Sequence, residues 1–410
     1  MPREKALYLS RPVTGGQLDL RHGDMGRLGD SNDSNARRLM LDFQNLLTII
    51  ESPDFTRSTS NRLRRRGLNL LSLDGGGVRG LFSLIVLEAI LAEVERRDTI
   101  NGSRRLPYEY FDLIGGTSTG GLLAIMLGRL QMDIPSCLQA YRNMSENVFS
   151  RSDNLLSSVR DGIDALVGNP WFSGDQLKAA ICGTVRDQIS VRERSYLENA
   201  GLTVEDVRLL STDVQKTRCF VCAICEGHHR AERIRSYLPA NRAVRDTSSY
   251  TIWQAGRATS AAPMYFPAID IQGHHYFDGG LQCNNPVLEV VEEAHEEFPD
   301  ADIDTIVSIG TGKGAVSDPL PPVFNVITSL IGRLTNAEAQ HEQFISSREF
   351  EKLRASYFRF QEEEDLGKID LAASDKIDEI EKLAREYVKS PTTKRSMEIC
   401  AARILKSPRF

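Results

Sequence analysis

The sequence predicts an α/β fold with a mostly parallel central sheet. Between residues 67 and 315, short apolar runs alternate with helix-like segments, as in βαβ units. Two of the apolar runs end in glycine-rich turns, "DGGGVRG" and "GTSTG", and each turn leads directly into an apolar helix. The strands that we expect from these runs are Leu68–Leu73, Tyr110–Gly115, Cys219–Cys225 and Thr305–Ile309.

The composition along the chain divides it into three sections. Residues 1–66 are polar apart from one possible amphipathic helix, and they end in a basic linker, "NRLRRR". Residues 67–315 carry the α/β pattern and form the expected main domain, in which the acidic run Glu289–Glu297 is most simply the solvated face of a helix. Residues 316–410 are charged and helix-like after a proline-rich start. We expect them to form a helical C-terminal part packed on the main domain.

The overall composition excludes several classes of protein. The 410 residues carry a net charge of -6, which argues against generic nucleic-acid binding. The N-terminus has no apolar signal core. No apolar run reaches the roughly 20 residues that span a bilayer. We therefore expect a cytoplasmic protein that contacts membranes only peripherally.

The second glycine-rich turn predicts a nucleophile. In "GTSTG", Gly116, Ser118 and Gly120 form G-x-S-x-G between an apolar strand and an apolar helix. Such a turn forces the serine into a strained conformation and projects its hydroxyl above the sheet. The two glycines are expected where strand and helix pass too closely for a Cβ atom.

The first glycine-rich turn predicts an anion site. Its letters match the dinucleotide-binding fingerprint, but that fingerprint needs an acidic residue at the end of the next strand, about 20 residues on. Here the next strand ends in the serine turn instead, so we expect no nucleotide cofactor. The amides of Gly75, Gly76 and Gly77 precede a helix, and we expect them to hold the oxyanion of a tetrahedral intermediate.

A serine nucleophile needs a base, and "YFDGGLQCNNPV" offers Asp278. Gly279 and Gly280 allow a sharp bend directly after it, so an extended segment could hold the carboxylate facing Ser118. Asp-Gly-Gly by itself also marks ordinary turns. The prediction therefore depends on the three motifs occurring together.

In this order, "DGGGVRG", "GTSTG" and "DGG" resemble the patatin-like phospholipase family, and "WQAGRATSAAPMYFPA" and "IVSIGTGKG" resemble further segments of it. The resemblance covers roughly residues 67–408 and is closest to fungal members. It implies a three-layer α/β/α sandwich and a lipid acyl hydrolase with a Ser-Asp dyad. Ser118 would be the nucleophile and Asp278 the base, with Arg79 and Gly80 supporting the glycine loop.

A metal site is not expected. Cys219, Cys222 and Cys225 precede His228 and His229, so zinc is one interpretation of this segment. The apolar run favours a buried strand instead, because residues three apart on a strand point to opposite faces and the three sulfurs cannot converge. We find no convincing calcium-binding loop either. We expect no cofactor.

Three functions fit these residues. The favoured one is a calcium-independent phospholipase A or lysophospholipase that acts on phospholipids at a membrane surface. The second is a general carboxylesterase or triacylglycerol lipase with a Ser-His-Asp triad, whose histidine would be His274, His275, His295 or His341. The third is a storage or scaffold protein on the same fold. A regulatory protein partner or a further module downstream stays open.

Overall fold

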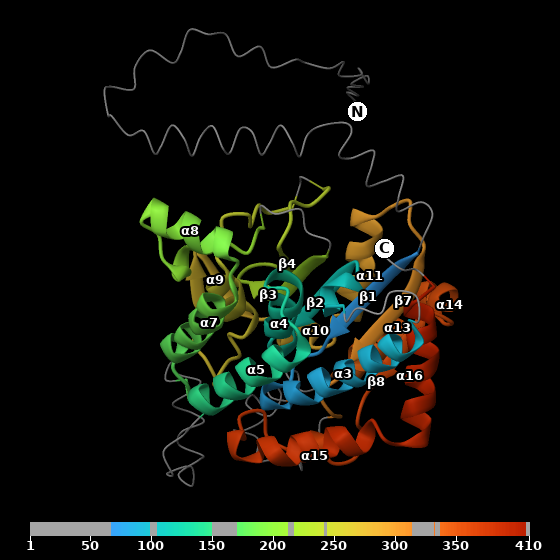
Figure 1. The fold of residues 1–410 in the computed structure, drawn as a ribbon. Coiled ribbons are helices and arrows are strands. Elements are labelled where there is room, and N and C mark those ends of the chain that lie inside the picture. Colours follow the sequence, from blue (N-terminus) through green and yellow to red (C-terminus); the bar gives the residue numbers. More distant parts are fainter. Residues whose placement is uncertain are drawn as a thin grey trace, which may run out of the picture. The chain divides into compact units, whose positions relative to one another are not determined.

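A computed structural model gives the structure of residues 67–98, 105–149, 170–211, 217–241, 244–313, 332 and 337–406. The predicted N-terminal extension, residues 1–66, lies outside the described residues. Figure 1 shows a central sheet with helices on both of its faces. The fold is therefore the predicted three-layer α/β/α arrangement.

Eight strands of the described chain form one sheet in the order β5-β6-β3-β2-β1-β7-β8, with β4 also paired to β3. Strands β1, β2, β3, β7 and β8 pair in parallel, whereas the β3–β4, β3–β6 and β5–β6 pairs are antiparallel. The strands are β1 Leu68–Leu73, β2 Leu113–Thr117, β3 Arg218–Cys225, β4 Glu232–Arg235, β5 Ile269–Ile271, β6 His274–Asp278, β7 Ile303–Ile309 and β8 Tyr357–Phe360. This is the mostly parallel sheet that the sequence predicts.

Strand β1 shows why the apolar runs form buried strands. All six of its residues are buried, as expected of a central parallel strand that is covered on both faces. Leu71 and Leu73 join the hydrophobic core on one face of the sheet. Leu68 and Leu70 join the core on the other face.

The helices divide between these two cores. The larger core contains residues of α3, α4, α5, α7, α8, α9, α15 and α16, and the smaller one contains residues of α10, α11, α13 and α14. None of the helices in the described ranges has both the length and the apolarity to cross a bilayer. The helices are α3 Gly80–Arg97, α4 Thr119–Ala124, α5 Ile134–Val148, α7 Gly174–Gln188, α8 Val191–Ala200, α9 Ile252–Thr259, α10 Gly280–Cys283, α11 Val287–Glu297, α13 Ala337–Ile345, α14 Arg348–Leu353, α15 Ile377–Tyr387 and α16 Pro391–Ile404. A π-helical turn, Ile125–Arg129, continues α4.

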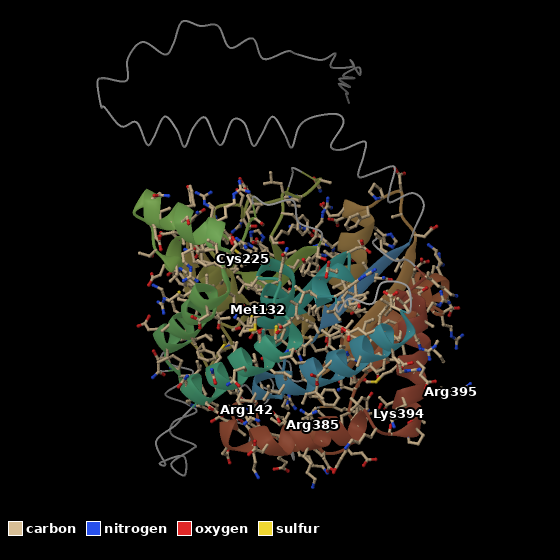
Figure 2. The ribbon with its side chains drawn as sticks, viewed as in Figure 1. Met132, Arg142, Cys225, Arg385, Lys394 and Arg395 are labelled. Atoms are coloured by element: carbon tan, nitrogen blue, oxygen red, sulfur yellow. The ribbon has the colours of Figure 1, made fainter. Side chains whose placement is uncertain are left out.

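The C-terminal section does more than pack on the main domain. Its strand β8 pairs in parallel with β7 and so completes the sheet, a strand that the sequence analysis missed. The same section covers α3 with α15 and α16. The outer side of this layer is charged, and Figure 2 labels Arg385 on α15 and Lys394 on α16 there. The described residues 337–406 therefore contribute to the main domain itself and not only to its surface.

Strand β2 begins and ends later than predicted. A 3-10 turn, Pro107–Glu109, occupies the residues before it. The Asp112 carboxylate accepts a hydrogen bond from the backbone amide of Asn69 at 2.9 Å, so the side chain of Asp112 links this segment to β1. The strand then runs from Leu113 to Thr117. Its end is therefore adjacent to Ser118, which places the serine at the carboxyl end of a central strand.

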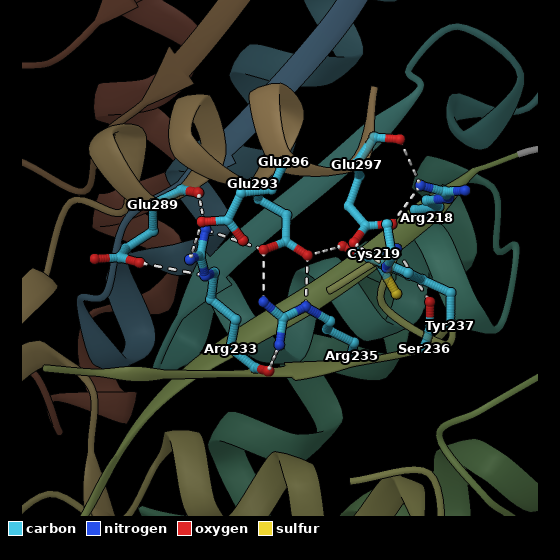
Figure 3. Close-up of polar contacts among 11 residues, drawn as sticks. Arg218, Cys219, Arg233, Arg235, Ser236, Tyr237, Glu289, Glu293, Glu296 and Glu297 are labelled. Carbon is cyan, nitrogen blue, oxygen red and sulfur yellow. Dashed lines mark hydrogen bonds and ion pairs between the residues drawn. The ribbon is translucent and has the colours of Figure 1, made fainter. Parts of the chain in front are cut away.

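The acidic run Glu289–Glu297 is not simply a solvated helix face, contrary to the prediction. Glu293 is fully buried on α11 and Glu297 is nearly so. Figure 3 shows Glu293 between two arginines of β4, and its Oε2 lies 2.7 Å from Arg235 Nη2 and 3.0 Å from Arg233 Nη1. Strand β4, which the sequence analysis did not predict, lies against this helix. The partners of these carboxylates are therefore distant in sequence.

We expect Glu293→Gln to destabilise the fold by about 3–5 kcal/mol, because it leaves the buried Arg235 and the partly buried Arg233 without their shared carboxylate. Burial alone would raise the pKa of Glu293, but hydrogen bonding and charge from Arg235 hold it below its ordinary value. A lowered pKa means that the stabilisation is complete above the ordinary carboxyl range and is lost as the pH falls below it. Urea unfolding at neutral and acidic pH measures both effects.

Glu292→Gln is the matched control for this prediction. Glu292 is the neighbouring residue on the same helix, but its side chain is 45% exposed and 3.8 Å from Arg230. An exposed pair of this kind contributes about 0–1 kcal/mol. Equal losses in the two variants would contradict the importance that we give to the buried pair.

Candidate active site

Ser118 lies at the turn between β2 and α4. Its backbone has φ 53° and ψ −122°, a conformation that is costly for a residue with a side chain. Strand and helix cross so closely that a Cβ on Gly116 would lie 2.0 Å from the Gly120 carbonyl oxygen, and one on Gly120 would lie 2.1 Å from the Leu73 carbonyl oxygen. The two glycines are therefore required by the crossing, as the motif predicts.

The strained serine is held by a neighbouring helix. The Ser118 amide donates to Thr259 Oγ1 at 2.9 Å, and that hydroxyl donates to the Cys222 carbonyl at 2.6 Å. Thr259 is the last residue of α9 and is fully buried. The sequence analysis did not identify Thr259, although it belongs to the quoted segment "WQAGRATSAAPMYFPA". A threonine connects the serine turn to β3 in this way.

Asp278 is the last residue of β6 and is fully buried. Antiparallel pairing with β3 places it opposite Ala223, and its own amide donates to the Ala261 carbonyl at 3.0 Å. Its Oδ1 accepts the Gly280 amide at 2.6 Å. A Cβ on Gly279 would lie 2.5 Å from the Cys222 carbonyl oxygen, which explains a glycine there.

The environment of Asp278 suits a base that works near neutral pH. Burial raises the pKa of this carboxyl to about 7, and hydrogen bonds with the Ser118 side chain and the Gly280 amide act in the opposite direction. A general base is most effective when its pKa lies near the working pH. Asp278 therefore combines a position beside Ser118 with a matched proton affinity.

The glycine loop presents two free amides rather than three. The Gly75 amide donates to the Asn284 carbonyl at 3.0 Å, so the expected role of Gly75 as an oxyanion donor does not fit this geometry. The Gly76 and Gly77 amides donate to no acceptor in the part of the chain that the structure describes. Gly77 has φ +55° and fits tightly against Leu371, where a Cβ would clash with the carbonyl oxygen.

Two buried ionisable side chains, Arg79 and Asp74, stabilise the glycine loop. Arg79 is buried, and its Nε donates to the Gly76 carbonyl at 3.3 Å. Asp74, also buried, accepts from Arg359 Nη2 at 2.7 Å. Burial raises the pKa of Asp74 to about 6, against the opposing charge of Arg359. Gly80 leaves space for the Thr119 side chain, since a Cβ on Gly80 would lie 2.1 Å from Thr119 Cγ2.

Arg359 is a second residue that the sequence analysis missed. It lies on β8, and nothing in the local sequence "YFRFQ" indicates that its partner is Asp74. The pairing depends on the sheet order. Asp74 directly follows β1, and β8 lies two strands away in the same sheet, with β7 between them. Asn284 is a third missed residue, and its side-chain amide donates to the Gly75 carbonyl at 3.4 Å.

A pocket with about 600 Å³ of empty space, part of it open solvent, contains these groups. Ser118, Asp278, Gly76 and Gly77 line it, whereas Gly75 does not. The rest of the wall is mostly apolar, with Leu122, Met144, Phe149, Leu177, Ala262, Tyr265, Phe266 and Leu371, and it also includes Thr119, Tyr141, Ser145, Ser260 and Asn284. An apolar cavity with a few converging polar groups is typical of a site for a small, largely apolar ligand.

No histidine of the described residues lines this pocket. His275 Nδ1 lies 2.8 Å from the Asp270 carboxylate, and His274 is exposed. His295 lies 3.0 Å from Glu349, and His341 lies 2.8 Å from the Tyr357 hydroxyl. The histidines that a Ser-His-Asp triad would need are therefore engaged elsewhere or exposed.

The cysteine run on β3 is a buried strand, as predicted. Cys219 and Cys225 face the larger hydrophobic core, whereas Cys222 faces the smaller one. The three sulfurs therefore cannot bind one ion.

Fold and site together define the class: an α/β protein with a serine at a strand-to-helix turn, a buried aspartate beside it and free glycine amides in the same pocket. The model of the family described as Patatin-like phospholipase matches residues 71–291, which is more than half of the chain. The chain belongs to this family. The matched range contains the three motifs on which the resemblance was based.

Several curated proteins are similar to the chain. Phospholipase A I of Arabidopsis thaliana is 30% identical over 304 residues, covering 65% of this chain and 22% of that protein. Human calcium-independent phospholipase A2-gamma is 30% identical over 252 residues, covering 61% of this chain and 29% of that protein. Patatin-like protein 2 of Arabidopsis thaliana is 24% identical over 375 residues, covering 81% and 85%.

The chain therefore spans less than a third of the first two relatives. These relatives come from a plant and a mammal, and the expected affinity with fungal members stays a prediction.

Proposed function

We propose that this protein is a lipid acyl hydrolase that cleaves ester bonds of phospholipids at a membrane surface with a Ser118–Asp278 dyad. The observation that carries the proposal is the meeting of three features in one largely apolar pocket. These are the serine on its strained turn, the buried aspartate with a pKa of about 7, and the two free amides of Gly76 and Gly77. The printed names of the relatives support a phospholipid as the substrate.

The proposed reaction uses these groups in two steps. The Asp278 carboxylate takes the hydroxyl proton as Ser118 Oγ attacks the ester carbonyl, and the Gly76 and Gly77 amides stabilise the resulting oxyanion. The intermediate collapses to an acyl-serine, and the leaving alkoxide receives the proton from Asp278. Water then attacks the acyl-serine as the same carboxylate takes its proton, and Asp278 gives this proton to Ser118 Oγ as the fatty acid leaves. The apolar wall would hold the acyl chain throughout.

The experiment is lipid profiling by mass spectrometry. Purified protein is incubated with phospholipid vesicles, and the Ser118→Ala variant serves as the blank. We expect free fatty acid and lysophospholipid to accumulate in equal amounts only with the unchanged protein. If a folded, monodisperse sample releases no fatty acid above the blank from phospholipid, lysophospholipid or triacylglycerol, the proposal is wrong.

We expect hydrolysis to persist in excess chelator. Calcium takes six to eight oxygen ligands, and Asp278 is the only carboxylate among the described residues that line the pocket. In the proposed reaction, backbone amides already stabilise the oxyanion. Initial rates measured with and without EDTA should agree within error. A loss of activity that calcium restores would point to a metal site in the reaction.

A further inference from the structure

The end of the cysteine run forms a cluster that the proposed reaction does not use. Strand β3 ends at Cys225, a turn contains His228, and β4 begins at Glu232. One ligand atom from each of these three side chains, a sulfur, an imidazole nitrogen and a carboxylate oxygen, lies within 4.8 Å of the other two. A single antiparallel hairpin thus brings together three different metal-ligating groups.

A positive group already lies among them. Arg245 Nη1 is 3.2 Å from Cys225 Sγ, and Arg245 Nη2 is 3.0 Å from His228 Nε2 and 3.4 Å from Glu232 Oε1. The His228 Nδ1 atom also lies 3.2 Å from Glu232 Oε1. The three side chains therefore point at one cation, and the guanidinium takes that place here.

We propose that Cys225, His228 and Glu232 form a zinc-binding site, in which Zn²⁺ takes the place of the Arg245 guanidinium. Thiolate, imidazole and carboxylate are all ligands of Zn²⁺, with water completing four coordination. The thiolate and the imidazole favour zinc over calcium or magnesium, which prefer oxygen ligands. The Cys225 thiol loses its proton to solvent when the metal binds.

The surroundings fit such an exchange. The other carboxylate oxygen of Glu232 accepts from the Tyr276 hydroxyl at 2.9 Å, and Tyr276 lies 3.0 Å from the Tyr250 hydroxyl. Tyr276 is fully buried, so it fixes the orientation of Glu232 as outer partners of metal ligands do. Arg245 itself is 22% exposed at its side chain. It can move into water without crossing the core.

The cluster is separate from the proposed active site. None of its three ligands lines the pocket of Ser118. Figure 2 labels Cys225 by the sheet, apart from Arg142, whose helix α5 contributes to the pocket wall. Strand β3 links the two sites, because its Ala223 is paired with Glu232 on β4 and with Asp278 on β6. Zinc would therefore brace the β3–β4 hairpin without taking part in hydrolysis, and the inference does not depend on the proposed function.

The test is direct zinc binding by the full chain. The protein is dialysed against chelator, and Zn²⁺ is titrated by calorimetry at neutral pH with Cys225→Ser, His228→Ala and Arg245→Ala beside it. We expect one zinc per chain, and loss of Cys225 or His228 should weaken binding by more than the about 10–100-fold that loss of an outer partner costs. Arg245→Ala should bind several-fold more tightly, because a competing cation is gone. His229→Ala, next to the cluster but outside it, should bind like the unchanged protein.

Spectroscopy provides a readout that does not depend on affinity. Cobalt(II) bound at the site should give a thiolate charge-transfer band that disappears in Cys225→Ser, and X-ray absorption of the zinc form should show one sulfur at about 2.3 Å. Binding that is equal in all variants, or a zinc shell without sulfur, overturns the proposal. So does the absence of binding in both the unchanged protein and Arg245→Ala. Circular dichroism confirms that each variant is folded.

Discussion

Asp278→Asn should lower kcat/KM for ester hydrolysis by about 10³-fold or more, near the upper part of the range for general-base catalysis. Asparagine keeps the size of the side chain and one oxygen for the Gly280 amide, which lies 2.6 Å from Oδ1. It cannot accept the proton of Ser118. The loss should therefore appear in kcat with an unchanged fold, measured with a short-chain ester reporter and circular dichroism.

The matched controls are His274→Ala and His275→Ala. Both histidines lie on the same strand as Asp278, and neither lines the pocket. Each variant should keep most of the activity. A folded histidine variant as inactive as Asp278→Asn would mean that the site is a triad.

The same carboxyl should determine how the rate depends on pH. Asp278 acts as a base only when deprotonated, and burial raises its pKa to about 7. Activity should therefore be high above pH 7 and fall about tenfold per pH unit well below it. An acid limb near pH 4, where an ordinary aspartate titrates, would show that burial does not govern this group.

Ser118→Ala should abolish hydrolysis, with a loss on the order of 10⁴–10⁶-fold as in other hydrolases that lose a serine nucleophile. Alanine keeps the Cβ atom, and the backbone amide keeps its 2.9 Å hydrogen bond to Thr259. The turn should therefore survive at φ 53° while the attacking oxygen is gone. A fluorophosphonate probe, followed by peptide mass spectrometry, should label the unchanged protein at Ser118 and leave the variant unlabelled.

Ser260→Ala is the control for this labelling. Ser260 also lines the pocket and is largely buried, but it does not lie on a strained turn. Its loss should leave labelling at Ser118 intact. Labelling at Ser260, or turnover by Ser118→Ala at the normal rate, would contradict the assignment of the nucleophile.

Features that depend on neighbours in the chain are predictable from the sequence alone. The β1 strand Leu68–Leu73 follows from an apolar run bounded by glycines. The elbow at Ser118 follows from the spacing of Gly116 and Gly120, because only glycine allows the helix to cross the strand so closely. These are local steric requirements. They are therefore visible in short stretches of the sequence.

Features that depend on which elements pack together were decided only by the tertiary structure. Pairing of β6 with β3 places Asp278 in the pocket with Ser118. The Asn284 carbonyl accepts the hydrogen bond of the Gly75 amide, which the motif alone had predicted to bind an oxyanion. The sequence predicts that Glu293 is a solvated residue of an acidic helix, whereas in the structure two arginines of β4 lie against it. A short motif specifies its own backbone, but the partner of a buried polar group is whichever element the sheet order brings beside it. That order is set by the packing of the whole domain.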